Sequence, residues 1–326
     1  MSTSFSDPEF GPRSVTVVIA AKDAQDTIGR AVASCLAQPD ACEVIVVDDG
    51  SSDDTAGAAR AKDDGSGRLS VIKLDQNQGP AAARNIALNQ AKGVWYTMVD
   101  SDDFLDEGRL ASLLDIAGED YDFVADDLWL VDEGNEDGPR RKMWDAPPEE
   151  ARCPLTFEYF LEGNIAHKDR IRRELGFIKP IIRRSSIEKE SLRYKEHMRL
   201  SEDLIFYCEL FLSGARSLLV EPTGYVAVRR ANSLSGRHGT EELAHYYHAV
   251  LDLQKRPGLS PTERRVLARF RNSVARRYRW SRLIDAKKSK NLGEAVACFA
   301  TSPDIIAMLI KNVVISLFSK IRSSEE

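Results

Sequence analysis

Four runs of β-branched and aromatic residues, separated by helical patterns, constrain the fold of this chain most strongly. The runs occupy residues 15–21, 43–47, 69–74 and 94–99, and the helical patterns occupy residues 27–37, 54–62 and 81–91. Runs that are apolar on both faces are typical of strands buried inside a parallel sheet. Strands that alternate with helices predict right-handed crossovers between parallel neighbours. We therefore expect an α/β fold with a mostly parallel central sheet flanked by helices.

The fourth run ends on a cluster of acids, Asp100, Asp102 and Asp103, in the sequence VWYTMVDSDD. Open α/β sheets bind their ligands outside the carboxyl ends of the strands. Carboxylates this close repel one another, so we expect a counter-cation, Mg²⁺ or Mn²⁺, that can also hold substrate phosphates. The alternative is that Asp102 or Asp103 caps a helix beginning near Leu105.

The turn DDGSS follows the second run and offers Asp48 and Asp49 at a strand end. A carboxylate there can accept hydrogen bonds from a base N–H or from ribose hydroxyls. The alternative is a plain strand-to-helix turn capped by Ser51 or Ser52.

The segment NQGPAAARN follows the third run and places Gly79 directly before a predicted helix, with Arg84 in its first turns. A helix start beside an arginine can bind phosphate or sugar hydroxyls. The alternative is a capped surface helix. Neither G-x-x-x-x-G-K-[ST] nor G-x-G-x-x-G occurs in the sequence, which disfavours a nucleoside triphosphatase or a dinucleotide enzyme.

The composition narrows the class of protein further. The chain has 326 residues, 43% of them hydrophobic, and a formal net charge of −6, which does not indicate binding to nucleic acid. Its five cysteines form no C-x-x-C pair and predict free thiols in a reducing cytosol. The first fourteen residues lack the apolar core of a signal peptide, and we expect no ordinary transmembrane helix.

Together, the segments VTVVIAAKDAQDTIGRAVASCLAQ, VIVVDDGSSDDT, QNQGPAAARNIALNQAKGVW and MVDSDDFLD resemble the family 2 glycosyltransferases of the GT-A fold. The resemblance covers about the first 110 residues, with Lys22-Asp23 standing where that family commonly has Tyr-Asn. It implies an inverting transferase that uses a nucleotide-diphosphate sugar, such as a UDP-sugar, and Mn²⁺ or Mg²⁺.

The resemblance also implies roles for individual residues. Asp49 would contact the base, Asp100 the ribose side, and Asp102 and Asp103 the metal and diphosphate. The remaining residues that we expect to contact the donor are Ala21, Asp23, Asp48, Gly79, Arg84, Ser101, Arg229 and Arg237.

A second block, GFIKPIIRR followed by SEDLIFYCELF, matches the same family and contains the pair Glu202-Asp203. We predict that Asp203 is the general base, which removes a proton from the acceptor hydroxyl, and that Glu202 orients substrate. The N-terminus of a helix over 204–212 would favour the ionised form of both acids. The alternative is that both are ordinary first-turn acids of that helix.

The segment YVAVRRANSLSGRH, residues 225–238, is predicted to be a basic loop that closes over the donor diphosphate through residues such as Arg229 and Arg237. A solvated basic loop is the alternative. Together with GFIKPIIRR and SEDL, the sequence SLSGRH resembles glycosyltransferases of succinoglycan-type bacterial exopolysaccharide assembly. That resemblance implies a lipid-linked oligosaccharide or a growing polysaccharide as the acceptor.

We expect a GT-A domain over residues 1–240, with a donor half at about 14–131 and an acceptor half at about 150–238, then a helical extension over 241–326. Residues 261–290 carry eleven Lys and Arg against two acids, and IIAMLIKNVVISLF follows at 305–318. This apolar run is too short to span a bilayer but suits its interface. Residues 264–322 therefore predict contact with a membrane surface, peripheral at the inner face of the plasma membrane. Packing on the core or on a second copy, as a homo-oligomer, is the alternative.

Three functions fit these features. The first is a glycosyltransferase at the cytosolic face. The second is a GT-A-like nucleotidyltransferase, which should carry a glycine-rich, basic phosphate loop where this chain has AAKDAQDT. The third is a catalytically inactive scaffold or membrane-docking subunit, against which the intact Asp102, Asp103 and Asp203 argue.

Overall fold

The computed structural model describes residues 10–144, 151–166, 173–230 and 238–322. The chain divides into two compact units. Unit 1 comprises Met1–Phe160 and Arg173–Leu234, and unit 2 comprises Leu161–Arg172 and Ser235–Glu326.

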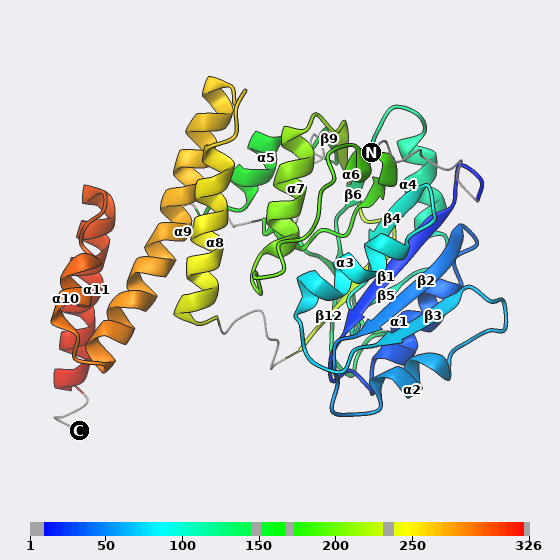
Figure 1. Cartoon of the computed structure of the whole chain (residues 1–326), viewed down its shortest axis with the longest axis horizontal. Helices are drawn as coiled ribbons and strands as arrows, with labels where there is room; N and C mark the ends of the chain where they lie inside the picture. Colours follow the sequence, from blue (N-terminus) through cyan, green and yellow to red (C-terminus); the bar gives the residue numbers. More distant parts are fainter. Residues whose placement is uncertain (1–9, 145–150, 167–172, 231–237, 323–326) are drawn as a thin grey trace. The chain divides into compact units, whose positions relative to one another are not determined.

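Unit 1 is built on a sheet whose described strands run in the order β3-β2-β1-β4-β10-β6-β11-β9 (Figure 1). The strands are β1 (Val15–Ala21), β2 (Ala41–Asp48), β3 (Leu69–Lys73), β4 (Trp95–Met98), β6 (Phe123–Asp126), β9 (Arg152–Pro154), β10 (Ile181–Arg183) and β11 (Ser217–Val220). Only β9 and β10 run antiparallel to their described neighbours. The prediction of a mostly parallel α/β sheet is confirmed.

Helices connect many of these strands, and those between β1 and β4 follow the predicted alternation. They are α1 (Ile28–Leu36), α2 (Thr55–Arg60), α3 (Pro80–Gln90), α4 (Arg109–Ala117), α5 (Phe157–Gly163), the 3₁₀ turn η2 (Leu175–Phe177), α6 (Arg184–Lys189) and α7 (Glu202–Leu212). Helix α1 buries Ile28, Val32 and Leu36 against the sheet, at the spacing expected of one helix face. Burying side chains of this size stabilises the fold by about 1.5–3 kcal/mol each.

Strand register brings the polar strand ends to one edge of the sheet. Ala21 of β1 pairs with Asp48 of β2, and Val18 of β1 pairs with Met98 of β4, two residues before Asp100. Strand β10 runs antiparallel to β4, so it begins at the edge where the parallel strands end. The residues that precede β10 therefore lie beside the acidic end of β4.

The stretch 121–132 forms two strands in different sheets. Strand β6 pairs with β11, whereas β7 (Trp129–Asp132) pairs with β12 (Tyr225–Arg229). The break falls at Asp127, whose Oδ1 accepts a hydrogen bond from the N–H of Leu128 at 2.7 Å. This side-chain acceptor competes with the ladder and turns the backbone.

The structure differs from the sequence analysis in the start of one helix and in the extent of one loop. No helix begins near Leu105, because Phe104–Leu105 forms the short strand β5, and α4 begins at Arg109 after Gly108 with φ +77°. Residues 225–229, predicted as part of a loop, form β12, which pairs with both β5 and β7. The second sheet has the order β5-β12-β7-β8, with β8 at Arg141–Lys142. Its first strand in the sequence, β5, therefore follows the acidic cluster directly.

Unit 2 contains four helices among its described residues, α8 (Thr240–Gln254), α9 (Pro261–Lys288), α10 (Leu292–Ala297) and α11 (Pro303–Arg322). Helix α9 begins with a capping box, in which the Ser260 side chain accepts from the N–H of Glu263 and the Glu263 side chain accepts from the N–H of Ser260. Ile305 and Leu309 of α11 pack on Ala275 and Leu283 of α9. Among the described helices of the chain, none combines the length and the apolar character that crossing a membrane requires.

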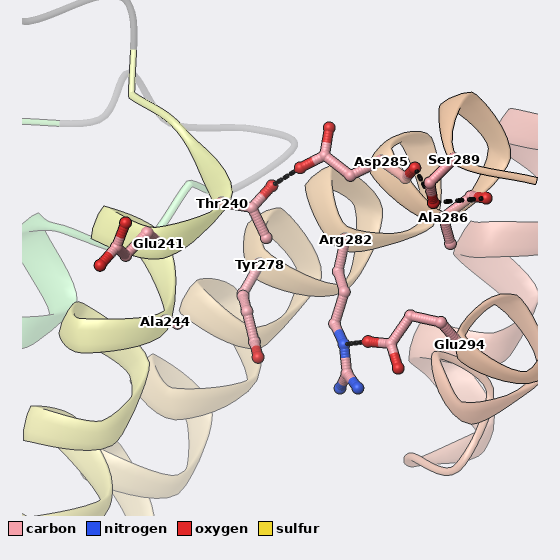
Figure 2. Close-up of a pocket in the computed structure, with 9 residues that line it drawn as sticks. All are labelled: Thr240, Glu241, Ala244, Tyr278, Arg282, Asp285, Ala286, Ser289 and Glu294. Carbon is pink, nitrogen blue, oxygen red and sulfur yellow. Dashed lines mark hydrogen bonds and ion pairs between the residues drawn. The ribbon is translucent and has the colours of Figure 1, made fainter. Parts of the chain in front are cut away.

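Unit 2 also holds a cavity of about 420 Å³ (Figure 2). It is lined by Thr240, Glu241, Ala244, Tyr278, Arg282, Asp285, Ala286, Ser289 and Glu294. Figure 2 shows that its polar side chains pair with one another, Arg282 with Glu294 and Thr240 with Asp285. The charges of Arg282 and Glu294 in this cavity therefore compensate each other.

A fully buried ion pair fastens α4 to the sheet in unit 1. Arg109 Nη2 lies 2.7 Å from Asp126 Oδ1 and donates to the carbonyl of Lys179 at 2.5 Å. Its guanidinium carbon also lies 5.2 Å from the ring centroid of Tyr225. One side chain therefore ties α4, β6, β12 and the segment before β10 together.

We predict that Arg109→Met lowers the free energy of unfolding by about 3–5 kcal/mol, because it leaves Asp126 charged and unpaired in the interior. Chemical denaturation followed by tryptophan fluorescence measures the change. Arg141→Met is the matched control, since Arg141 and its partner Asp132 are exposed and 3.5 Å apart, and its cost should stay within about 1 kcal/mol. Equal costs for the two variants would contradict this account of the core.

Candidate active site

The DDGSS turn joins the ends of β1 and β2. Asp49 donates its N–H to the carbonyl of Ala21 at 2.8 Å. Its carboxylate accepts from the N–H of Gln78 at 2.6 Å and of Gly79 at 2.8 Å. Asp48, by contrast, is fully buried, and its Oδ1 accepts from the N–H of Ser51 at 2.9 Å. Asp48 therefore shapes the turn from inside, whereas Asp49 holds the turn against the start of α3.

The loop after β1 is tied to the same turn. Asp23, at φ +48°, accepts from the N–H of Ser52 at 2.8 Å and donates its own N–H to the Ser51 hydroxyl at 2.9 Å. Lys22 donates to the carbonyl of Gly50 at 3.0 Å. These contacts place the two predicted donor-binding loops side by side at the edge of the sheet.

Gly79 makes the close approach of the third loop feasible. Its φ of +97° is in a region that residues with a Cβ rarely adopt, and its N–H points at Asp49. Helix α3 then begins with Pro80 and carries Arg84 on its buried side.

Arg84 does not point into open solvent, as a lone phosphate-binding arginine would. Its Nη1 lies 2.6 Å from Glu202 Oε1 and 2.8 Å from Asp203 Oδ1, and its Nη2 lies 3.6 Å from Asp100 Oδ1. The structure thus brings Arg84 and Asp100 together with Glu202 and Asp203, which follow them by more than a hundred residues in the sequence.

Lys179 completes this group, and sequence analysis did not identify it as a site residue. Its Nζ lies 2.8 Å from Asp100 Oδ2 and 3.8 Å from Asp203 Oδ2, and only 4% of the side chain is exposed. A signal was present in GFIKPII, because a lysine inside an apolar run must find carboxylate partners when it is buried. We refer to Arg84, Asp100, Lys179, Glu202 and Asp203 as the bridged cluster.

Within the bridged cluster, the pKa values of Asp100 and Asp203 shift in opposite directions. Burial opposes ionisation of Asp100, but Lys179 and Arg84 outweigh it and lower the pKa of Asp100. Burial raises the pKa of Asp203 to about 6, against the pull of Arg84 and with a further push from Glu202. Burial therefore outweighs the stabilisation of the ionised form that the N-terminus of α7 would give Asp203.

Asp102 and Asp103 differ in what they can offer a ligand. Asp103 is buried, and its carboxylate accepts from the Tyr225 hydroxyl at 2.7 Å and the N–H of Val228 at 2.8 Å. Burial, together with the neighbouring Asp100 and Asp102, raises the pKa of Asp103 to about 8. Asp102 is partly exposed, and its Oδ2 lies 3.6 Å from Arg230 Nε. Burial and the charge of Asp100 raise the pKa of Asp102 as well.

These acids fit a divalent cation. The described residues contain no ready-made group of three or more His, Cys, Asp or Glu side chains for a metal. Mg²⁺, however, is commonly held by one or two carboxylates plus substrate phosphates. Asp102 has an accessible oxygen and a pKa raised partly by a like charge, which a cation would relieve. Both oxygens of Asp103 accept hydrogen bonds, so this residue is placed to fix the loop after β4 rather than to serve as the main metal ligand.

Of the remaining predicted donor contacts, the structure describes Ser101 and Arg229. Ser101 is half-buried between Asp100 and Asp102. Arg229 is exposed at the end of β12, while Arg230, which follows it, lies 3.3 Å from Glu133 Oε1. Arg237, the other arginine predicted to cover the diphosphate, lies outside the described residues.

Comparison with known proteins gives the class of this fold and site. A family model described as "Glycosyl transferase family 2" matches residues 16–185. The succinoglycan biosynthesis protein ExoU of Rhizobium meliloti is 38% identical over 313 residues, which cover 96% of this chain and 90% of that protein. The fold is that of a GT-A glycosyltransferase. The chain belongs to glycosyl transferase family 2, and the resemblance seen in its motifs is confirmed.

Further relatives share parts of the chain. ExoO of Rhizobium meliloti, another succinoglycan biosynthesis protein, is 36% identical over 226 residues, or 68% of this chain and 62% of that protein. WfaP of Escherichia coli, a UDP-Glc:alpha-D-GlcNAc-diphosphoundecaprenol beta-1,3-glucosyltransferase, is 41% identical over 91 residues, or 28% of this chain and 36% of that protein.

Two solved structures show the same fold at low identity. S. aureus TarS 1–349 in complex with UDP-GlcNAc has a TM-score of 0.65 at 19% identity, covering 88% of this chain and 79% of that one. Mannosyltransferase PcManGT from Pyrobaculum calidifontis, in complex with GDP-Man and Mn²⁺, has a TM-score of 0.56 at 18% identity, covering 97% and 84% respectively.

Proposed function

We propose that this glycosyltransferase moves a sugar, with inversion, from a UDP-sugar to a hydroxyl of a lipid-linked oligosaccharide or a growing exopolysaccharide. The observation that carries the proposal is the bridged cluster. Arg84 and Lys179 join Asp100, at the end of β4, to Asp203, at the start of α7. A donor-side carboxylate and a candidate base are therefore held beside one another at the edge where α/β sheets bind ligands.

The donor would lie across the loops at the ends of β1, β2 and β4. Asp49 would meet the base, and Asp100 the ribose, with Ala21, Asp23, Gly79 and Ser101 as the surrounding contacts. In support, Asp23 ties the loop after β1 to the turn after β2, and Asp49 ties that turn to the loop before α3. UDP as the nucleotide is supported by the UDP-GlcNAc complex of TarS and by the UDP-Glc in the description of WfaP.

Mn²⁺ or Mg²⁺ would be held by Asp102, with Asp103 fixing the loop, and Arg229, Arg230 and Arg237 would approach the diphosphate. When bound, such a cation would neutralise the charge that develops on the leaving diphosphate. The Mn²⁺ in the PcManGT complex supports a divalent metal in a protein of this fold.

Asp203 would accept the proton of the acceptor hydroxyl. A neutral alcohol is a weak nucleophile, and a positioned carboxylate removes its proton as the bond to the anomeric carbon forms. A pKa of about 6 leaves Asp203 largely ionised near neutral pH yet more basic than an ordinary carboxylate. Glu202, which shares Arg84 with Asp203, would orient substrate.

The acceptor is supported by the relatives, since ExoU and ExoO are succinoglycan biosynthesis proteins and WfaP is described with a diphosphoundecaprenol acceptor. Unit 2 offers a surface for such a lipid-linked acceptor. Its exposed large apolar side chains lie on α10 and α11: Leu292, Val296, Ile310, Val314 and Ile315. We call these five residues the apolar face.

The apolar face suits a bilayer interface more than the core of unit 2. The buried Ile305 and Leu309 lie four residues apart and face α9, whereas Ile310 and Val314 lie four apart on another side of α11. The exposed Lys290 and the other basic residues nearby, Lys287, Lys288 and Lys311, would add attraction to anionic lipid. We therefore propose that unit 2 places the enzyme peripherally at a membrane.

We predict that tight UDP binding requires Mn²⁺ or Mg²⁺, because the carboxylate of Asp102, beside that of Asp100, repels a diphosphate unless a cation lies between them. Isothermal titration calorimetry with UDP, with metal and then with excess EDTA, measures the difference. Equal affinity under the two conditions would contradict a metal at this site.

Asp203→Asn should lower the transfer rate by about 10²- to 10⁴-fold, because the amide keeps the shape but cannot accept the proton. Nucleotide release in the presence of a lipid extract measures transfer, and UDP affinity should stay close to that of the wild type. The wild-type rate should also fall as the pH drops through about 6, where Asp203 becomes protonated. A variant that keeps more than about a tenth of the wild-type rate would place the base elsewhere.

Replacing Ile310, Val314 and Ile315 by Ser should weaken binding to anionic vesicles at least tenfold, since each side chain contributes on the order of 1.5–3 kcal/mol when buried in lipid. Co-sedimentation with phosphatidylglycerol-containing vesicles measures binding. Phe177→Ser is the matched control, because Phe177 is an exposed apolar residue of unit 1. If the triple variant instead changes the mass seen by light scattering and leaves vesicle binding intact, the apolar face is an interface between copies.

A further inference from the structure

Lys179 lies where the two halves of the bridged cluster meet. It directly precedes Pro180 and β10, and the Thr97 hydroxyl of β4 donates to the Pro180 carbonyl at 2.8 Å. Arg109 donates to the carbonyl of Lys179 itself at 2.5 Å. Both neighbours are buried, so the backbone of Lys179 is fixed from two directions. Its ammonium is held in turn by burial, with 4% of the side chain exposed, and by the 2.8 Å contact of Nζ with Asp100 Oδ2.

The two cations of the cluster contact Asp203 in different ways. Arg84 Nη1 lies 2.8 Å from Oδ1 as an ion pair, and this buried oxygen accepts no hydrogen bond from the described residues. Lys179 lies 3.8 Å from Oδ2, beyond hydrogen-bonding distance but close enough for strong attraction. The shorter contact of Lys179, at 2.8 Å, is with Asp100 Oδ2. Lys179 thus presents positive charge to Oδ2 without using that oxygen in a hydrogen bond.

We propose that Lys179 is a positioning residue for transfer, which holds Asp203 ionised with Oδ2 available to the acceptor hydroxyl while anchoring on Asp100 of the donor side. The inference rests on the proposed function of Asp203 as the base. As a consequence, Asp100 on the donor side and Asp203 on the acceptor side share the buried charge of Lys179. A change in the charge or position of Asp100 therefore alters Asp203 through Lys179.

Several charged groups face Asp203, and each contributes to its titration. Arg84 from α3 and Lys179 from the segment before β10 favour the ionised form, whereas Glu202 on α7 and Asp100 at the end of β4 oppose it. The buried phenols of Tyr96, Tyr194 and Tyr207 nearby have a raised pKa and stay neutral. Removing Lys179 therefore removes one of the two favourable charges and leaves both unfavourable ones.

The test is the pH dependence of kcat in Lys179→Met, with the full chain, Mn²⁺, a lipid extract and whichever UDP-sugar the wild type uses. The acidic limb should move to higher pH by about one unit or more, because an opposite charge at this distance lowers a carboxyl pKa by about that much. The rate should then recover partly towards pH 9. Lys179→Arg keeps the charge and should keep the acidic limb at the wild-type pH, even where its kcat is lower.

Lys195→Met is the matched control. Lys195 pairs at 2.8 Å with Glu209 of α7, the helix that also carries Asp203, so this variant too removes a lysine–carboxylate pair at α7. Its acidic limb should coincide with that of the wild type. UDP binding by calorimetry confirms that each variant is folded, and Lys179→Gln takes the place of Lys179→Met if the methionine variant fails to bind UDP.

A uniform loss of kcat at every pH, with the acidic limb unmoved, would overturn the inference and leave Lys179 a purely structural residue. The inference would also be overturned if the acidic limb moved to higher pH in Lys179→Met and moved equally in Lys179→Arg. The proposed function is tested independently of this inference: it is contradicted if Asp203→Asn retains turnover, whatever the result for Lys179→Met.

Discussion

Two buried cations, Arg84 and Lys179, compensate three carboxylates at the edge of the central sheet, and the geometry of the site depends on that compensation. With every group ionised, the bridged cluster keeps one negative charge in excess. Asp203 responds to this surplus and to its burial with a raised pKa, whereas Asp100, with the closest ammonium, has a lowered one. The same contacts that hold the acids together thus separate them into a donor-side anion and a candidate base.

Sheet topology explains why these groups meet. The parallel strands β1, β2 and β4 end at one edge, and the antiparallel β10 begins there, which brings Lys179 to Asp100. Arg109 then links the carbonyl of Lys179 to Asp126 and to the ring of Tyr225, whose hydroxyl holds Asp103. The acidic loop after β4 and the lysine before β10 are therefore supported by the same buried arginine.

Local pattern was sufficient to predict the strands of the parallel half, the order of the loops and the clustering of the acids. Local pattern was insufficient where the burial, the contacts or the strand boundary of a residue depends on a partner distant in sequence. Whether Asp48 is buried and Asp49 bound to the next loop depends on the fold of residues 78–79, and the break at Asp127 depends on pairing with β11 and β12. Lys179 was missed for the same reason, because its carboxylate partners lie just after β4 and on α7. The site roles themselves stay predictions.

The central claim is that the bridged cluster joins a nucleotide-sugar site to a base that acts on an acceptor. The most direct measurement is a screen of nucleotide release across UDP-, GDP- and dTDP-sugars, with a lipid extract as the source of acceptor and with Mn²⁺ or EDTA. The account predicts release from a UDP-sugar that depends on both the metal and the lipid extract. Release from none of these donors, or equal release in EDTA, would contradict it.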